Sequence, residues 1–551
     1  MAWLTASWLL VAGWPCQAQV ALQIGQNFTG TTEDGNNPIT PPDCNGAIGP
    51  QHFVEFINGS FTVYSKTNGQ SLGRITDVKF WADAGLNVSG YPAVSDPRVI
   101  FDPATQRWFA SQVDANATAS DPTLYANDFL FAVSSTPDPR GAWQAFSFRA
   151  DPDHGYFADF PTLGLDSNAV YLAGDYFYGA SNAVGPGLVS IPKADLVGAT
   201  PTVANRTWFG VMDYSVRGQV LQPAACFDGS SSGSVLAMGD IGTDSDPHSN
   251  MVSFAVLNAA SHSATLSAPV SISIPPYEVP YNSDMGAPLF NPMQPDGTTT
   301  LQANDARLSA HVYAVNGVLY AVHNTELNGR IAIRWYRINA ATAAVLEAGT
   351  ISDPALDLFF PSIAANANGT VIIAYNGSSG NVYVSCYAVA GQTVNGVTTF
   401  GSPLLLQSGL VSYHDYNEVF SQLLGGPVTD SRWGDYSTVS VDPIDQSRFW
   451  MINMYPSGQD SSGTFGIWST QITQLLTSSS YNPVVSLAQF GAQGLISWPA
   501  TAANFTLQSN TNLSSSNNWM PVTGNFTTNN GQISVQVALT NGAQFFRLHQ
   551  L

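Results

Sequence analysis

Six aspartates and three arginines recur at corresponding places along the chain, each just before or at the start of a short alternating segment. Carboxyl groups that converge on one place repel each other, which raises some of their pKa values and suits them to acid–base chemistry. An arginine holds a carboxylate or sulfate through two parallel hydrogen bonds. The residues are Asp43, Asp96, Asp159, Asp305, Asp357, Asp435, Arg98, Arg307 and Arg432.

Two interpretations of this set stay open. In the first, Asp96, Asp159 and Asp435 supply the general acid and the base or nucleophile, while substrate is bound by Arg98, Arg307, Arg432, Tyr436 and Trp433. In the second, each aspartate caps a turn through backbone N–H groups, and Asp–Arg pairs join neighbouring sheets. For a single aspartate the structural role is favoured, whereas for the whole set a pocket is about equally favoured.

The elements that must position these residues form a repeat of about 65 residues. Each unit has a polar or proline-containing start, a short strand, a turn, a second strand that ends in Asn or Asp, and a third strand. The units begin at Asp43, Asp96, Asp159, Gln222, Arg307, Phe360 and Asp435. Antiparallel units of this length are typical of propeller blades. Tandem β-sandwiches would explain the strands but not the recurring polar start and Asn/Asp end.

The repeat predicts an all-β protein, with a seven-bladed β-propeller over residues 19–476. Because the unit at Asp435 has three clear strands, we expect residues 20–28 to be the fourth strand that closes the ring. Residues 477–484 have the composition of a linker. The alternating segments in residues 485–551 predict a small β-sandwich accessory domain.

Several segments resemble a family of secreted bacterial β-propeller proteins, mostly of unassigned activity and loosely grouped with sialidase-like propellers. These segments are residues 41–50, 52–58, 95–98, 159–164 and 432–437, and the resemblance covers roughly residues 40–475. It implies the propeller fold rather than a particular reaction. The sequence lacks the Ser-x-Asp-x-Gly-x-x-Trp box of true sialidases, which counts against that activity.

An acidic loop in the fourth unit is a candidate metal site. Asp240, Asp244 and Asp246, with His248 nearby, could supply oxygen ligands for Ca²⁺, the only cofactor that the sequence suggests. A solvated acidic turn is the alternative. The Gly229–Gly233 segment matches G-x-S-x-G but lies in a turn between strands, so we interpret it as a chance match. His52 and Glu55 lie three residues apart on a strand, so their side chains should point to opposite faces.

Composition limits the compartment and the partners. The chain has 551 residues and a net charge of −21, which disfavours nucleic acid as a partner. Residues 1–18 fit a signal peptide, and no later segment is apolar enough to span a membrane, so we expect a secreted monomer. After signal cleavage Cys44, Cys226 and Cys386 remain, and we expect them to be buried free thiols.

Two functions from different classes follow. The first is a glycan-active enzyme, a glycosidase or polysaccharide lyase, that acts on a polysaccharide or glycoconjugate at the central pocket of the propeller. The second is a non-catalytic extracellular propeller that binds glycans or proteins at the cell surface. The fold alone does not decide between them.

Overall fold

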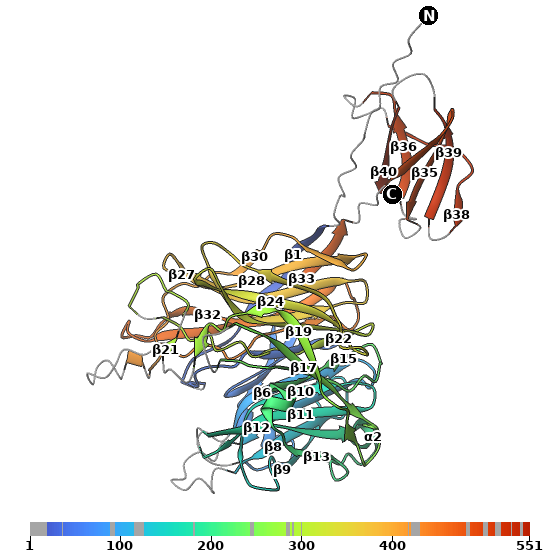
Figure 1. Cartoon of the computed structure of the whole chain (residues 1–551). Helices are drawn as coiled ribbons and strands as arrows, with labels where there is room; N and C mark the ends of the chain where they lie inside the picture. Colours follow the sequence, from blue (N-terminus) through green and yellow to red (C-terminus); the bar gives the residue numbers. More distant parts are fainter. Residues whose placement is uncertain are drawn as a thin grey trace, which may run out of the picture. The chain divides into compact units, whose positions relative to one another are not determined.

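The computed structural model describes residues 19–35, 37–88, 94–114, 126–179, 182–242, 247–282, 287–288, 291–298, 300–416, 418–419, 430–480, 485–499, 505–512, 519–529, 532–539 and 544–550. The expected signal peptide, residues 1–18, lies outside these ranges. Strands dominate, and the helices of the described chain are short: α1 (Asp77–Asp83), α2 (Lys193–Val197) and α3 (Tyr214–Arg217). Figure 1 shows the strands gathered into antiparallel sheets. The all-β prediction is confirmed.

The first half of the chain forms one antiparallel sheet per sequence repeat. The sheets consist of β2 (Asn45–Ile48), β3 (His52–Ile57), β4 (Ser60–Ser65) and β5 (Ser71–Ile75); β6 (Val94–Asp102), β7 (Arg107–Asp114), β8 (Asp128–Ser134) and β9 (Trp143–Arg149); β10 (Phe157–Leu165), β11 (Ala169–Tyr178), β12 (Asn182–Pro192) and β13 (Thr207–Val211); and β14 (Gln219–Pro223), β16 (Ser234–Met238), β17 (His248–Leu257), β18 (Thr265–Leu266) and β19 (Val270–Tyr277).

The second half continues the pattern up to residue 480. Its sheets consist of β22 (Tyr313–Val315), β23 (Val318–Leu327), β24 (Arg330–Asn339) and β25 (Val345–Ile351); β26 (Asp357–Ala365), β27 (Thr370–Ser379), β28 (Val382–Val394), β29 (Val397–Phe400) and β30 (Leu404–Gln407); and β31 (Thr438–Val441), β32 (Arg448–Gln459), β33 (Gly466–Ser480) and β1 (Gln19–Thr32). A short hairpin, β20 (Tyr281–Asn282) with β21 (Ala287–Pro288), lies apart from these sheets in the pairing pattern.

The first strands of the sheets contact one another in a closed cycle. β2 contacts β6, β6 contacts β10, and β10 contacts β14. The short strand β15 (Ala225–Cys226) pairs in parallel with both β10 and β22, and the cycle continues through β26 and β31 back to β2. The first strands therefore face a common centre, as the repeat predicts.

Both ends of the repeat region meet in one sheet. β1 is hydrogen-bonded to β33, so the N-terminal strand is the fourth strand of the sheet that contains β31. The expectation for residues 20–28 is confirmed, although the strand extends from Gln19 to Thr32. At the other end β33 continues to Ser480, so strand pairing reaches into the segment expected to be a linker.

A buried glutamate stabilises this closure. Glu55 on β3 has no exposed surface, and its carboxylate accepts hydrogen bonds from four donors: the Thr31 N–H at 3.2 Å, the Thr31 hydroxyl at 2.7 Å, the Tyr64 hydroxyl at 2.8 Å and the Thr470 hydroxyl. Thr31 belongs to β1 and Thr470 to β33. One carboxylate therefore joins the first sheet to both paired strands of the last.

The fifth unit differs from the sequence prediction. We expected its first strand to begin at Arg307, but β22 begins at Tyr313. The Arg307 N–H donates instead to Oδ1 of Asp305 at 2.8 Å, and the Asp305 N–H donates to the side chain of Asn304. These local side-chain acceptors favour a turn over a strand. Residues 302–307 are therefore free to line the centre of the ring.

The chain divides into two compact units, residues 22–478 and the remainder. The described strands after residue 480 form two sheets: β34 (Ser486–Phe490), β35 (Gln493–Pro499), β39 (Gln532–Ala538) and β38 (Thr527–Asn529), and β37 (Met520–Pro521), β36 (Phe505–Asn510) and β40 (Phe545–Gln550). Ile496 and Trp498 of one sheet and Leu507 of the other are buried in a shared core. The three cysteines Cys44, Cys226 and Cys386 are buried and free, as expected.

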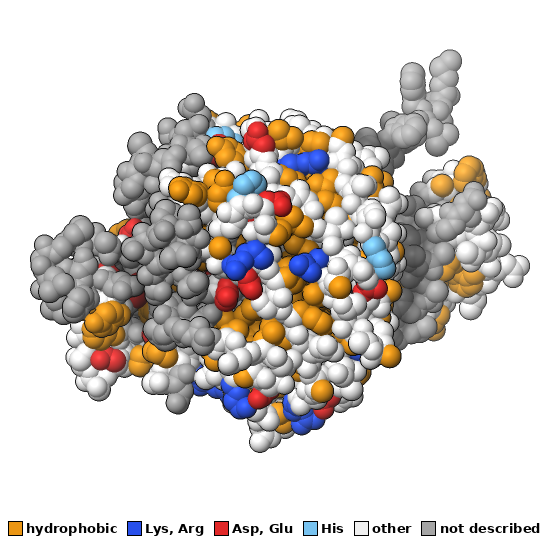
Figure 2. Space-filling view, turned by 90° about the horizontal axis from the view of Figure 1, so that it is seen from below, with side chains coloured by type: hydrophobic (Ala, Val, Ile, Leu, Met, Phe, Trp, Pro, Cys, Tyr) orange, Lys and Arg blue, Asp and Glu red, His pale blue; other side chains and the backbone are white. Residues whose placement is uncertain are grey.

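Charged side chains are sparse on the described surface. On the face in Figure 2, those of both signs are scattered among hydrophobic and uncharged ones. Within the described ranges, no helix is both long and apolar enough to cross a membrane.

Replacing Glu55 by Gln tests the closure. The amide nitrogen of Gln cannot accept hydrogen bonds, so at least one buried donor loses its partner, and the free energy of unfolding should fall by about 1–3 kcal/mol. Urea unfolding of both proteins measures this difference. The exposed residue Glu278 offers a matched control, because Glu278→Gln should change stability by less than about 0.5 kcal/mol. Equal losses for the two variants would contradict the role of Glu55.

Candidate functional site

A polar hollow of about 290 Å³ lies at the centre of the ring, where the first strands begin. It is lined by Asp96, Asp159, Phe160, Gln302, Asn304, Arg307, Arg432 and Asp435. The structure thus brings together five of the site residues expected from the sequence: Asp96, Asp159, Asp435, Arg307 and Arg432. They come from four different sheets or their connections, which explains why only the closed ring assembles them.

Backbone bulges position several of these side chains. Asp96, Phe160, Val220 and Phe360 have φ values of 59°, 47°, 54° and 48°, in the left-handed region, and the strand register shifts at each. Pro97, Pro161 and Pro361 follow three of them. Because proline has no N–H to pair, a bulge is one of the few places that accept it within a strand. Non-glycine residues with positive φ are strained, and such strain clusters at functional sites.

Two arginines at the hollow already hold carboxylates. Arg432 binds both oxygens of Asp435, and Arg307 binds both oxygens of Asp305 through Nε and an Nη at 2.8 and 2.6 Å. Burial raises the pKa of Asp435, but the charge and hydrogen bonds of Arg432 outweigh it and keep the pKa below its ordinary value. Asp435 is therefore ionised.

Two other carboxyl groups at the hollow have no arginine partner. Among the described residues, the Asp96 carboxylate has neither a hydrogen-bond donor nor an ion-pair partner, and Asp159 accepts only from the backbone N–H of Phe160. Burial, followed by repulsion from Asp159 and Asp435, raises the pKa of Asp96 to about 7. Burial also raises the pKa of Asp159, against the influence of Arg307. The hollow thus combines one ionised carboxyl group, Asp435, with two whose pKa values are raised.

Carboxyl groups outnumber arginines around the hollow as well. Burial, then repulsion from Asp435 and Asp96, raises the pKa of Asp43 well above its ordinary value. Asp175, which sequence reasoning missed, has a pKa raised to about 7, chiefly by burial. Asp43 accepts from the Asp435 N–H at 2.6 Å and from Asn58 at 3.0 Å, so it acts as the cap that the structural interpretation proposed.

Three residues expected to bind substrate lie beneath the hollow instead. Arg98, Trp433 and Tyr436 have exposed fractions of 1%, 0% and 1%, so none can contact a molecule in the hollow, and the expectation is corrected. The Trp433 indole donates to Asn376, and the Tyr436 hydroxyl donates to the Pro97 carbonyl. Asp357 also lies away from the hollow, where it accepts from the Ile331 N–H and contacts Arg330.

Arg98 is a structural cation at the centre of the ring. Its guanidinium lies 3.4 Å from the ring centre of Tyr436 and donates to the carbonyls of Pro161 and Ser309. These contacts join two sheets with the segments that precede β22 and β31. Arg98, Arg307 and Arg432 all lie at or near the start of a repeat unit. Sequence reasoning therefore could not distinguish a buried arginine from one that lines the hollow.

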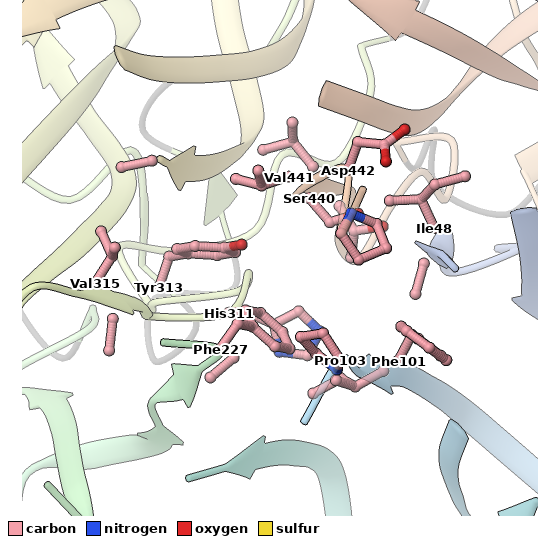
Figure 3. Close-up of a pocket in the computed structure, with 18 of the residues that line it drawn as sticks. Ile48, Phe101, Pro103, Phe227, His311, Tyr313, Val315, Ser440, Val441 and Asp442 are labelled. Atoms are coloured by element: carbon pink, nitrogen blue, oxygen red, sulfur yellow. The ribbon is translucent and has the colours of Figure 1, made fainter. Parts of the chain in front are cut away.

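A second pocket lies farther along the same strands, and Figure 3 shows it. It has a volume of about 200 Å³ and a mostly apolar lining that includes Phe101, Phe227, His311, Tyr313 and Val441. Along one strand the order is Asp96 at the hollow, Arg98 buried, then Val99 to Phe101 at the second pocket. In the segment that leads into β31, Asp435 lines the hollow and Tyr436 is buried. Thr438 to Asp442 then line the second pocket. Arg98 and Tyr436 therefore fill the centre between the two spaces.

The remaining motifs are also placed. Asp244 and Asp246 lie outside the described residues, while Asp240 accepts from the Gly242 N–H at 2.9 Å. Within the described part of the chain no group of three His, Cys, Asp or Glu residues is arranged to hold a metal, and calcium binding at this loop stays a prediction. The Gly229–Gly233 segment lies between β15 and β16, with no helix after it.

Gln302 and Asn304 were missed by the sequence analysis. They precede the residue where a strand was expected, in a segment with no strand periodicity. The turn-forming sequence Asn304-Asp305-Ala306-Arg307 is the signal that could have indicated them.

Comparisons with known proteins give no family. No protein-family model and no curated protein matches the chain. Similar solved structures include a thermostable family-43 glycoside hydrolase, with a TM-score of 0.28, 11% identity, and coverage of 72% of this chain and 90% of that one. An α-L-arabinofuranosidase of Fusarium graminearum in complex with an iminosugar inhibitor has a TM-score of 0.36, 9% identity, and coverage of 82% and 97%.

A third similar structure comprises extracellular domains. Extracellular domains 1–2 of Drosophila Semaphorin 1b match with a TM-score of 0.31, 8% identity, and coverage of 82% of this chain and 87% of that one. These TM-scores are low, and no functional argument rests on them.

The raised pKa of Asp96 has a consequence for stability. Between about pH 4 and pH 7 the folded protein retains a proton that the unfolded chain has lost, so the free energy of unfolding falls as pH rises. The variant Asp96→Asn has no proton to lose at this position, so it lacks this pH-dependent loss of stability. Its melting temperature should exceed that of the parent by more at pH 8 than at pH 4. The control Asp83→Asn, at an exposed site on α1, should show no such difference. If Asp96→Asn raised the melting temperature equally at both pH values, the raised pKa of Asp96 would be contradicted.

The buried position of Arg98 predicts a structural effect. Arg98→Lys keeps the charge but loses the planar fork and its contacts with two carbonyls, so the free energy of unfolding should fall by about 1–3 kcal/mol. Chemical denaturation provides the measurement. Substituting the half-exposed Arg140 by Lys should leave the denaturation midpoint nearly unchanged. If Arg98→Lys were as stable as the parent, the structural assignment would fail.

Proposed function

We propose that the central hollow is the active site of a secreted glycan-active enzyme that hydrolyses glycosidic bonds. The observation that carries this proposal is that Asp96 and Asp159 line the hollow without arginine partners while Asp435 beside them is held ionised. Glycosidases use two carboxyl groups on either side of the scissile bond, one protonated and one ionised. The hollow contains both kinds.

The pKa values suggest the division of roles. Asp96, with a pKa of about 7, keeps its proton under mildly acidic conditions and would donate it to the leaving oxygen. Asp159, whose pKa burial raises while the Phe160 N–H and the charge of Arg307 oppose the rise, would act as the base or nucleophile. Asp435 is bound by Arg432, so its charge would stabilise positive charge that develops on the sugar ring.

The lining residues also favour hydrolysis over elimination. A lyase removes a carbon-bound proton and usually needs a strong base. Among the described residues that line the hollow there is neither histidine, lysine nor tyrosine. Arg307 and Arg432 keep N–H groups beyond those bound to carboxylates, and these could hold an acidic group of the substrate.

The architecture proposed with this function is a seven-bladed propeller with a small C-terminal β-sandwich. The closed cycle of first strands and the shared strand β1 support the ring, and the two sheets with a common core support the sandwich. Export through residues 1–18, and Ca²⁺ at the Asp240–Asp246 loop, belong to the same proposal.

A non-catalytic binding propeller is the second candidate. The pairing of Asp305 and Asp435 with arginines, and of Asp43 with backbone and Asn58, favours it, because these acids already have structural partners. Under this alternative Asp96 and Asp159 would contact a bound ligand but would catalyse no reaction on it.

A screen of the full-length protein separates the two candidates. Acidic and neutral polysaccharides are incubated with the protein, and both new reducing ends and unsaturated uronate absorbance are measured. New reducing ends are expected without uronate absorbance, with kcat/KM falling above about pH 7 as Asp96 loses its proton.

On the best substrate Asp96→Asn should lower kcat by about a hundredfold or more while the protein remains folded. The exposed Asp83→Asn serves as the matched control and should keep full activity. Full activity in a folded Asp96→Asn variant would overturn the catalytic role. Saturable binding without turnover would support the binding propeller.

A further inference from the structure

The C-terminal unit differs from the rest of the chain in charge. All 38 Asp and Glu residues precede residue 479, and between residues 479 and 551 Arg547 is the only Lys or Arg. An even distribution would place about seven charged residues in this segment. Folded surfaces usually carry charged residues over about a quarter to a third of their positions. A nearly uncharged surface therefore requires a physical explanation.

Strand register shows where this surface is exposed. Directly opposite residues of an antiparallel pair point to the same side, so Phe490, Gln493 and Ala538 share one side of the β34–β35–β39–β38 sheet. Leu495 and Gln536 form the next row on that side, and Ser497 and Ser534 the row after it. The opposite side carries Ile496, Trp498 and Val535, which are buried in the core. We call the first side the uncharged face; Figure 1 shows strands β35, β39 and β38 adjacent to one another.

The uncharged face is open to solvent. Phe490 is 67% exposed, and Gln493 and Gln536 are also exposed. The one arginine of the unit lies on the other sheet, where Arg547 donates to Gln508 at 3.0 Å and stacks on Trp519. The face therefore combines a four-stranded surface, an exposed aromatic ring, and amide and hydroxyl side chains.

We propose that the uncharged face binds a neutral polysaccharide. Sugar hydroxyl groups both donate and accept hydrogen bonds, and so do the Gln amides and Ser hydroxyls that line the face. Phe490 provides a flat apolar ring that can stack on the C–H side of a sugar. A charged polymer would find no counter-charge here, whereas an uncharged polymer loses nothing by its absence. This proposal goes beyond the hollow and does not depend on catalysis there.

The test uses the full-length protein and two kinds of probe. Co-sedimentation with microcrystalline cellulose, chitin and granular starch, and affinity electrophoresis in soluble glucomannan and xylan, measure binding to neutral glycans. Pectin and alginate are the acidic probes. We expect saturable binding to at least one neutral polysaccharide and at least tenfold weaker binding to the acidic ones. The same binding is expected of the Asp96→Asn variant, which shows that binding does not require catalysis in the hollow; the variants of the face itself separate it from the hollow.

Two Gln→Glu variants, one on each side of the sheet, provide the decisive comparison. Gln536→Glu places a negative charge on the uncharged face, while Gln489→Glu places the same charge on the opposite side of β34, next to Phe490 in sequence. Gln536→Glu and Phe490→Ala should each weaken binding at least tenfold, and Gln489→Glu by less than twofold. Circular dichroism and the melting temperature confirm folding of each variant.

Three outcomes would overturn the proposal. They are the absence of binding to every neutral probe, unchanged binding in Phe490→Ala and Gln536→Glu, and preferential binding to pectin or alginate. A concentration-dependent dimer that Phe490→Ala abolishes would assign the face to a second copy of the chain instead.

Discussion

The pairing of β1 with β33 is the interaction on which the rest of the repeat region depends. It joins the N-terminal strand to the last sheet, next to the contact between the first strands β2 and β31, where Thr438 is hydrogen-bonded to the backbone of Gly46. The buried Glu55 carboxylate accepts four hydrogen bonds at this junction, three of which come from Thr31 and Thr470 of the last sheet. A single residue far from the hollow thus helps to determine whether the acids at the centre meet at all.

Closure forces more carboxyl groups together than the arginines can neutralise. Asp305 and Asp435 are bound by arginines, whereas Asp43, Asp96, Asp159 and Asp175 have raised pKa values. Such an arrangement costs stability at neutral pH, and a protein built only for stability would replace some of these acids by amides. The protonated Asp96 beside the ionised Asp435 is the kind of difference that acid–base chemistry needs.

Sequence reasoning predicted the repeat, the strand class and the closing strand, because these follow from periodicity and from the rule that sheet edges must be paired. It also predicted that Asp96, Asp159 and Asp435 converge, since each lies at or just before the start of a first strand. Sequence reasoning failed where three-dimensional packing determines the position of a side chain. Arg98 and Arg307 are equivalent by sequence pattern, yet one is buried against Tyr436 and the other lines the hollow. The turn at Asp305 likewise replaced an expected strand through local hydrogen bonds that periodicity does not record.

The stack of Arg98 on Tyr436 affects how a molecule can enter and leave the centre of the ring. Because these two side chains fill the centre between the polar hollow and the apolar pocket, the ring is not an open passage. A molecule that enters the hollow must leave by the opening through which it came. Entry of the next molecule therefore has to wait for departure of the previous one, and whatever remains bound in the hollow competes directly with whatever arrives.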